Sequence, residues 1–229
     1  IEITKGPSAS FGGRGTTGGS VNSITKQAST DYDFQRVDIG VGTDDYVRGT
    51  ADANFRLSDS AAIRANLLYA YEEVPDRDPS DRKRWGAAVS GAFQFAPEVK
   101  LVLDYYHLTS RDRPDLGGYV PAPYGTAGNV TRPGPWAEVP AYSQEGDFLN
   151  TDQDTFTARL FVDIAPGIRL INAARYGETE NGYVLTGLRG GAYTQATNSF
   201  APLTLSSHQG WQEVEYFVNQ TNLMAEFDI

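Results

Sequence analysis

Residues 6–26 read GPSASFGGRGTTGGSVNSITK, and this glycine-rich stretch decides how the first part of the chain folds. Glycine tolerates positive φ angles and close approach of backbone, so a dense run of glycines indicates a sharply turning loop. Ile1 and Ile3 alternate with polar residues before the loop, and Val21, Ser23 and Thr25 share one face of the segment after it. This alternation is typical of strands. The stretch therefore predicts a strand, a glycine loop and a second strand.

The same glycines also fit a different pattern. Gly13, Gly15 and Gly18 have the spacing of the dinucleotide-binding fingerprint. That chemistry requires a helix after the loop, because the amides at the helix N-terminus hold the pyrophosphate. The segment after this loop alternates like a strand, which disfavours nucleotide binding.

The stretch resembles the end of the plug domain of TonB-dependent outer-membrane receptors. The matching residues are Lys5, Gly6, Pro7, Gly13, Arg14, Gly18, Gly19 and Asn22. Lys5 stands where the family more often has Arg, and Phe11 lies one position before the family's usual aromatic residue. The resemblance implies that residues 1–30 complete a plug. It also makes Phe11 a candidate ligand contact and Arg14 a candidate partner for a carboxylate of the barrel.

The composition of the 229 residues excludes several classes of function. Cysteine is absent, which excludes disulfides, thiolate metal sites and cysteine nucleophiles in these residues. The formal net charge of -10 disfavours nucleic acid as a partner, because such binding needs Lys and Arg against phosphates. The sequence contains no apolar run of about 18 residues that would predict a transmembrane helix, whereas β-barrels need only alternating segments.

Alternating segments follow one another from Phe34 onward. Residues 46–57 are the clearest, with Val47, Phe55 and Leu57 on one face and charged or polar residues on the other. The segments have about 10–13 residues, which is long for a globular strand and suits a tilted membrane-crossing strand. We therefore predict an all-β fold: an antiparallel transmembrane β-barrel fragment over residues 31–229, with about eight long strands, preceded by the plug end. A soluble β-sandwich with a covered apolar face is the alternative.

The predicted connections alternate in length, as they do between the two rims of an outer-membrane barrel. Tight turns fall at residues 58–60, 96–98 and 165–167, and the other links at residues 44–45, 74–82, 110–152 and about 181–210. With this direction, two aromatic girdles are expected. The outer girdle contains Tyr69, Tyr71, Trp85, Tyr105, Phe156 and Tyr176, and the inner one Phe55, Phe93, Phe95 and Phe227.

The sequence does not favour catalysis. His107 and His208 are the only histidines, and they are far apart without an evident partner, so we expect His107 on an outer-rim strand and His208 in a loop. We predict no enzyme activity, no catalytic residues and no metal ligands. The polar face would line the lumen and meet the plug, and its charged members are Arg36, Arg48, Arg56, Arg64, Arg159, Glu226 and Asp228.

The predicted loop at residues 110–152 is the best candidate for ligand recognition. It combines cations and aromatic rings with many Gly and Pro, and its candidate contacts are Arg111, Arg113, Tyr119, Tyr124, Trp136 and Tyr142. Such residues can stack on aromatic groups and donate charge-assisted hydrogen bonds. An anionic ferric siderophore offers partners for both.

The resemblance to TonB-dependent receptors implies uptake of a ferric siderophore, with catecholates as one class, across the bacterial outer membrane. The siderophore would be the transported ligand, with no covalently bound cofactor, and TonB would act on an N-terminal region that these residues do not include. A receptor of the same family for cobalamin, haem or an oligosaccharide is an open alternative, as are a different outer-membrane barrel and a soluble surface-binding sandwich. We also expect the chain to be an internal segment of a longer protein.

Overall fold

The computed structural model describes residues 2–6, 18–22, 25–117, 141–189, 193–194, 199–200 and 204–226. These residues form strands connected by turns and loops, and they include no helix that could span a membrane. The strands are β1 (Glu2–Lys5), β2 (Gly19–Asn22), β3 (Phe34–Val41), β4 (Val47–Ser58), β5 (Ala61–Glu73), β6 (Asp81–Ala96), β7 (Val99–Arg113), β8 (Phe148–Ala165), β9 (Ile168–Arg189), β10 (Tyr193–Thr194), β11 (Ser199–Phe200) and β12 (Thr204–Ala225).

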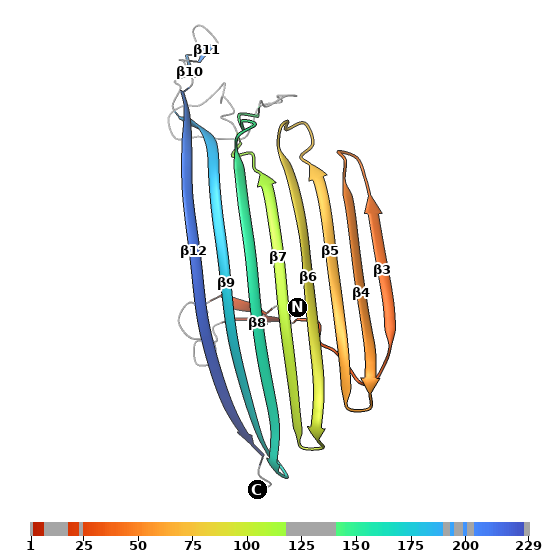
Figure 1. The fold of residues 1–229 in the computed structure, drawn as a ribbon. Coiled ribbons are helices and arrows are strands. Elements are labelled where there is room, and N and C mark those ends of the chain that lie inside the picture. Colours follow the sequence, from red (N-terminus) through yellow and green to blue (C-terminus); the bar gives the residue numbers. More distant parts are fainter. Residues whose placement is uncertain are drawn as a thin grey trace.

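One large antiparallel sheet dominates the fold (Figure 1). It has eight strands in the order β12-β9-β8-β7-β6-β5-β4-β3, so each strand pairs with its neighbours in the chain. The prediction of about eight antiparallel strands is confirmed. Strands β10 and β11 form a separate two-stranded sheet within the link between β9 and β12.

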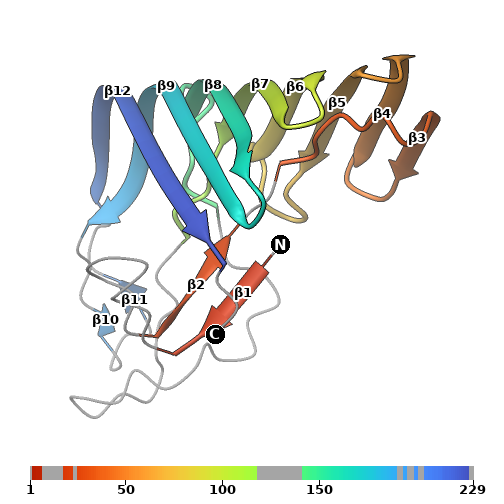
Figure 2. The same ribbon diagram turned by 90° about the horizontal axis from the view of Figure 1, so that it is seen from below.

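The first two strands form a hairpin on one side of the large sheet (Figure 2). Strand β1 pairs with β2 in antiparallel register, from Glu2 opposite Asn22 to Lys5 opposite Gly19. The predicted pair of strands around the glycine loop is confirmed. The prediction that the second strand continues to Lys26 is wrong, because β2 ends at Asn22 and residues 25–33 leave the hairpin without joining a strand.

The large sheet has two chemically different faces. Apolar side chains alternate along the strands and are exposed on the face away from the hairpin: Val47 is 42% exposed, Leu67 59% and Phe95 69%. The opposite face carries the buried polar side chains Asp52 and Asn54, and it contacts the chain that leaves the hairpin. The faces follow the predicted alternation, since neighbouring residues of a strand point to opposite sides.

The connections confirm the predicted alternation of short and long links. Residues 59–60, 97–98 and 166–167 are tight turns at one end of the sheet, and each is accompanied by a register shift in the adjoining strand pair. Gly167 has a φ angle of 73°, which a residue with a Cβ rarely adopts. The links at the opposite end span residues 42–46, 74–80, 114–147 and 190–203.

Several strands are longer than predicted. Strands β9 and β12 each have 22 residues, and β8 has 18, so they continue well into the links predicted at residues 110–152 and 181–210. His208 consequently lies in β12 and not in a loop, which corrects that prediction. A tilted strand needs only about 9–11 residues to cross a membrane, so the ends of these strands are expected to extend beyond it.

Aromatic side chains on the outward face form the outer girdle that the sequence predicted. Tyr105, Phe156, Tyr176 and Phe217 are consecutive partners in the register of β7, β8, β9 and β12. Tyr69 lies opposite Trp85 in β5 and β6. At the other end, Phe93 and Phe95 stack with ring centroids 6.5 Å apart. Phe227 lies outside the described residues.

The two faces can be tested at a single pair of neighbouring positions. In the full-length protein, Leu67→Arg places a charge on the apolar face, which is expected to meet lipid, whereas Leu68→Arg places the same charge on the opposite, polar face. We expect Leu67→Arg to destabilise the folded barrel by about 2–4 kcal/mol and Leu68→Arg by about 1 kcal/mol or less. Urea unfolding in lipid vesicles measures both, and equal losses would contradict the assignment of the faces.

Candidate functional site

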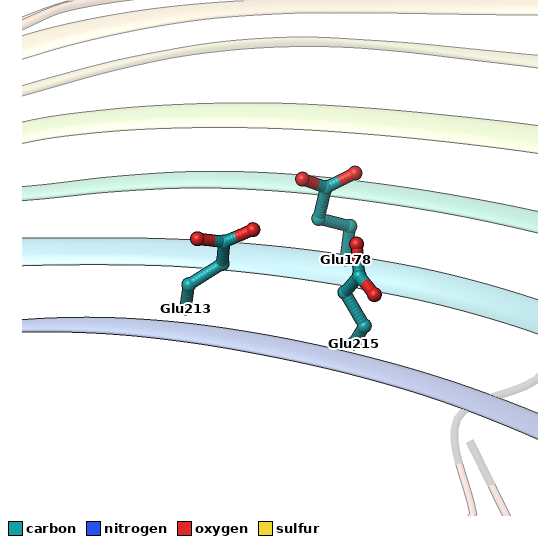
Figure 3. A group of neighbouring side chains, drawn as sticks. All are labelled: Glu178, Glu213 and Glu215. Carbon is teal, nitrogen blue, oxygen red and sulfur yellow. The ribbon is translucent and has the colours of Figure 1, made fainter.

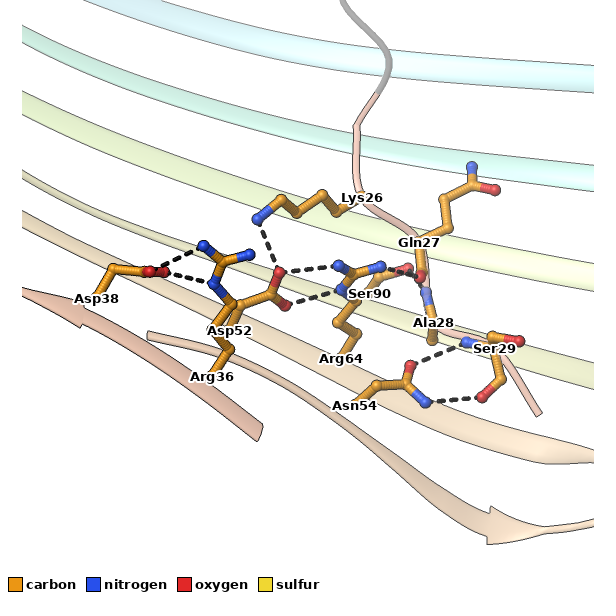
Figure 4. A network of polar contacts seen from close by, with 10 residues as sticks. All are labelled: Lys26, Gln27, Ala28, Ser29, Arg36, Asp38, Asp52, Asn54, Arg64 and Ser90. Atoms are coloured by element: carbon orange, nitrogen blue, oxygen red, sulfur yellow. Dashed lines mark hydrogen bonds and ion pairs between the residues drawn. The ribbon is translucent and has the colours of Figure 1, made fainter. Parts of the chain in front are cut away.

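The segment from Lys26 to Tyr32 crosses the lumenal face of β4, β5 and β6 (Figure 4). Asn54, whose side chain is fully buried, binds this segment much as a neighbouring strand would. Its Oδ1 atom accepts a hydrogen bond from the Ser29 amide at 2.9 Å, and its Nδ2 atom donates to the carbonyl oxygens of Ser29 at 2.8 Å and Tyr32 at 2.6 Å. The side chain thus satisfies backbone groups that would otherwise be unpaired.

Ala28, the residue before Ser29, makes a second contact with the wall. The Ala28 amide donates a hydrogen bond of 3.1 Å to the Ser90 hydroxyl of β6. The Ala28 side chain is 5% exposed and packs in a small apolar cluster with Ala62, Ala92 and Val102. Small side chains on the wall allow the crossing backbone to approach the sheet closely.

Asp52 of β4 is the centre of an ion network beside these contacts. Its carboxylate receives two hydrogen bonds from the Arg64 guanidinium, at 2.9 and 2.8 Å, and one from Lys26 Nζ at 2.7 Å. Arg64 also donates to the Gln27 carbonyl oxygen at 3.1 Å. The side chains of Asp52 and Arg64 are only 12% and 13% exposed, so the pair is largely shielded from water. Removing one partner of such a pair leaves an uncompensated charge.

Further arginine side chains project from the lumenal face, at the level of the ion network, where Arg36 lies opposite Asp52, and on its side toward the long links. We call Arg36, Arg48, Arg82 and Arg84 the lumenal arginine group. Arg36 pairs with Asp38 at 2.8 Å, Arg82 with Glu72 at 3.0 Å, and Arg84 with Asp112 at 3.4 Å. Arg48 makes no ion pair within the described part of the chain.

Two hollows on the lumenal face adjoin the lumenal arginine group. One has a volume of about 560 Å³ and is lined by Lys26, Arg36, Arg48 and Asp52 among others. The other has about 340 Å³, and Tyr46, Arg48, Arg82 and Arg84 contribute to its lining. Arg48 lines both hollows. The arrangement can bind an anion through guanidinium donors and place a phenol beside it.

The predicted ligand contacts Arg111 and Arg113 are not loop residues. Both lie on β7, which continues to Arg113, so the predicted start of the loop at residue 110 is wrong. Arg111 is on the same face of the strand as the girdle residue Tyr105, and it binds the Asp152 carboxylate through two hydrogen bonds of 2.9 and 2.7 Å. Arg113 donates to the Pro79 carbonyl oxygen at 2.8 Å. These contacts join neighbouring strands, and the role of Arg111 and Arg113 as ligand contacts stays a prediction.

The remaining candidate contacts are described only in part. Tyr142 is partly buried, and its carbonyl oxygen accepts a hydrogen bond of 3.0 Å from the Gln144 side chain. Phe11, Tyr119, Tyr124 and Trp136 lie outside the described residues. They stay predictions.

The structure describes the residues of the plug motif that lie on either side of the glycine loop. The Gly6 amide donates to the Gly18 carbonyl oxygen at 3.2 Å and extends the pairing of β1 with β2. Gly19 has a φ angle of 135°, and a Cβ there would collide with the Thr4 carbonyl oxygen, so the position requires glycine. Lys5 and Asn22 lie in the paired strands, whereas Pro7, Gly13 and Arg14 lie outside the described residues.

Two sequence relatives of this chain are named siderophore receptors, and a solved structure that resembles it is that of a ferric-catecholate import receptor. No family model matches the chain. The catecholate siderophore receptor Fiu of Escherichia coli K12 is 31% identical over 99% of this chain and 31% of its own length. The probable TonB-dependent siderophore receptor PiuA of Acinetobacter baumannii is 32% identical over 81% of this chain and 25% of its own length. The crystal structure of Escherichia coli Fiu in its closed form matches 98% of this chain with a TM-score of 0.85 and 28% identity, over 33% of that structure.

The chain belongs to the TonB-dependent outer-membrane receptors. It spans about a third of the length of the relatives it matches, 31% in the case of Fiu. The ferripyoverdine receptor of Pseudomonas aeruginosa also shares the fold, with a TM-score of 0.80 at 16% identity. The large sheet is therefore part of an outer-membrane barrel, its apolar face meets lipid, and the relatives are receptors.

In this TonB-dependent receptor, charged side chains begin directly beyond the outer aromatic girdle. Glu178 of β9 and Glu213 and Glu215 of β12 can bring one carboxylate oxygen each within 4.8 Å of one another (Figure 3). They follow Tyr176 and precede Phe217 on the outward face. Acidic residues at this level mark where the strands leave the lipid, and acidic clusters on exposed surfaces are common without a metal.

His107 has a partner that the sequence did not reveal. Its Nδ1 atom is 3.0 Å from a carboxylate oxygen of Asp154 on β8, and the centroid of its ring is 4.7 Å from the ring centroid of Trp85. The expectation that His107 lacks a partner is therefore wrong, although its predicted place on a strand is confirmed. The cross-strand position of Asp154 could not be read before the register of β7 and β8 was known.

The ion network at Asp52 predicts that loss of this carboxylate destabilises the receptor more than loss of an exposed carboxylate on the same wall. We expect Asp52→Ala to destabilise the complete protein by about 3 kcal/mol, because Arg64 loses its buried partner. The matched control is Asp38→Ala, which removes an exposed partner of Arg36 and is expected to destabilise the protein much less, because water screens this pair. Unfolding of the purified receptor in detergent by urea measures both variants. A similar loss in both would contradict a special role for the network.

Proposed function

We propose that this chain is part of a receptor that binds a ferric siderophore of the catecholate class at the outer face and imports it. The proposal is supported most by the lumenal arginine group together with the similarity to Escherichia coli Fiu, which is named a catecholate siderophore receptor. A catecholate binds ferric iron through deprotonated oxygens, so the complex is anionic. Guanidinium groups in a lumen attract and hold such a ligand.

The lumenal arginine group supports this proposal because it offers cationic hydrogen-bond donors beside two hollows. Arg48 has no carboxylate partner in the described part of the chain, and it lines both hollows. Arg84 makes only a long pair of 3.4 Å with Asp112, so its charge is only partly neutralised. Tyr46 adds an aromatic ring beside these groups. Phe11, Tyr119, Tyr124, Trp136 and Tyr142 are additional proposed contacts from the plug and the longest link.

We assign residues 1–30 to the end of the plug and residues 31–229 to the first part of the barrel. Transport in this proposal makes and breaks no bond, so the receptor is not an enzyme. Its partners are the lipid of the outer membrane, the ferric siderophore and TonB, which would act on a region N-terminal to these residues. No cofactor is needed, because the iron arrives and leaves with the ligand.

Import experiments test the ligand class. The complete receptor is expressed in a strain without its own siderophore receptors, and uptake of radioactive iron is measured with a ferric catecholate or a ferric hydroxamate. We expect uptake with the catecholate at least tenfold above that with the hydroxamate, and loss of this uptake in a strain without TonB. Preferential transport of the hydroxamate, haem or cobalamin would contradict the assignment.

Binding experiments test the role of the arginines. We expect Arg48→Gln and Arg84→Gln each to weaken binding of the ferric catecholate about tenfold, because each removes a charge-assisted hydrogen bond. The matched control is Arg56→Gln, a lumenal arginine beside the tight-turn end of β4 that pairs with Asp33 at 3.8 Å. It is expected to change the dissociation constant less than twofold. Fluorescence quenching of the purified receptor measures all three, and an equal loss at Arg56 would point to a nonspecific charge effect.

A further inference from the structure

The segment that leaves the plug hairpin is fixed to the barrel wall by contacts from several strands. We call the contacts of residues 26–32 with β4, β5 and β6 the wall clamp. Its barrel residues are Asp52, Asn54, Arg64 and Ser90. Each is on the lumenal face, and each contacts the backbone or the lysine of the segment directly (Figure 4).

The wall clamp satisfies the backbone of the segment through side chains of the barrel. The amides of Ala28 and Ser29 donate to Ser90 and Asn54. The carbonyl oxygens of Gln27, Ser29 and Tyr32 accept from Arg64 and Asn54. Release of the segment from the wall would break these hydrogen bonds together with the ion pair of Lys26 with Asp52.

The plug hairpin is held together by its own backbone. Strand β1 pairs with β2 from Glu2 opposite Asn22 to Lys5 opposite Gly19. The contacts of the wall clamp begin C-terminal to this hairpin, at Lys26. A force applied from the N-terminal side meets this fixed point only after it has passed through the hairpin.

We propose that residues 26–32 stay bound to the barrel wall during transport and that the plug moves about a hinge N-terminal to Lys26. This inference rests on the proposed import function, and it identifies the part of the plug that does not move. The wall clamp then returns the plug to the same position after each transport cycle, because the segment that joins the plug to the barrel stays at the same place on the wall. Asp52, Asn54, Arg64 and Ser90 are positioning residues and need not contact the ligand.

A covalent bond across the wall clamp tests the hinge. The 229 residues contain no cysteine, so Ala28→Cys with Ser90→Cys adds the only pair in this part of the receptor. The existing hydrogen bond of 3.1 Å between these residues places them side by side. The pair is introduced into the complete receptor in cells and joined by oxidation, or by a short bis-maleimide if it does not oxidise. Mass spectrometry of the isolated peptide pair establishes the fraction joined.

Uptake of ferric catecholate is then compared between the joined and the reduced receptor, with the two single-cysteine variants as controls. We expect the joined receptor to import at a rate within twofold of the reduced one, because the bond connects parts that do not separate. A larger loss that is reversed by reductant in the disulfide form, or that scales with the fraction joined by bis-maleimide, would overturn the inference.

The same experiment separates failure of the hinge from failure of the proposed function. If the unaltered receptor does not import a ferric catecholate, the proposed ligand is wrong, and the test is repeated with the ligand that is transported. If the unaltered and reduced receptors import it and the joined receptor does not, the ligand assignment stands and the hinge is rejected.

Discussion

The structure depends on the requirement that each strand present one face to lipid and the other to a wet lumen. Side chains alternate along a strand, so this requirement fixes both the period of the sequence and the register of neighbouring strands. A slip of one residue in β5 would turn Leu67 into the lumen and Arg64 into the lipid. The register observed instead aligns Leu67 with Ala51 and Ala87, and Arg64 with Asn54 and Ser90.

The same alternation creates the surface that receives the plug. The small side chains of Ala62 and Ala92 on the lumenal face leave room for the backbone at Ala28. Polar side chains one step along the same face, Asn54 and Ser90, supply hydrogen bonds to that backbone. A chain that crosses a sheet without pairing to a strand can stay buried only where such side chains meet its amides and carbonyl groups. The plug attachment is thus built into the pattern of the wall.

Much of this fold could be predicted from the sequence because its dominant signals are local. Period-two alternation reveals the strands and their faces, and the tight turns at Pro97 and Gly167 reveal one rim. Strand ends were harder to predict. Residues 111–113 are all charged and read as loop, yet Arg111 and Asp112 pair with Asn150 and Leu149 across β7 and β8, where the strands pass beyond the lipid. No apolar face is required there, so the pattern that identified the strands disappears before the strands end.

The contacts of the site could not be predicted from the sequence, for a different reason. The lumenal positions of Arg48 and Arg64 follow from alternation, but their partners depend on register and on where the crossing segment lies. Lys26 meets Asp52 across 26 positions of sequence, and Arg64 meets Gln27 across 37. Arg111 has the chemistry expected of a ligand contact, and only the structure showed its ion pair with Asp152 across the sheet.

The distribution of carboxylates along the lumenal wall connects attachment and recognition. Asp52 pairs with both Lys26 and Arg64 where the segment crosses, and it offsets one of their two positive charges; of the two cations, only Arg64 is largely shielded from water. Further along the wall, Arg48 faces the hollows without such a partner in the described residues. If Asp52 were absent, Lys26 and Arg64 would add to the positive charge lining the lumen, and an anion could bind at the plug attachment instead. Asp52 therefore lowers the net positive charge where the segment crosses the wall, whereas Arg48 makes no ion pair within the described residues and keeps its charge at the hollows.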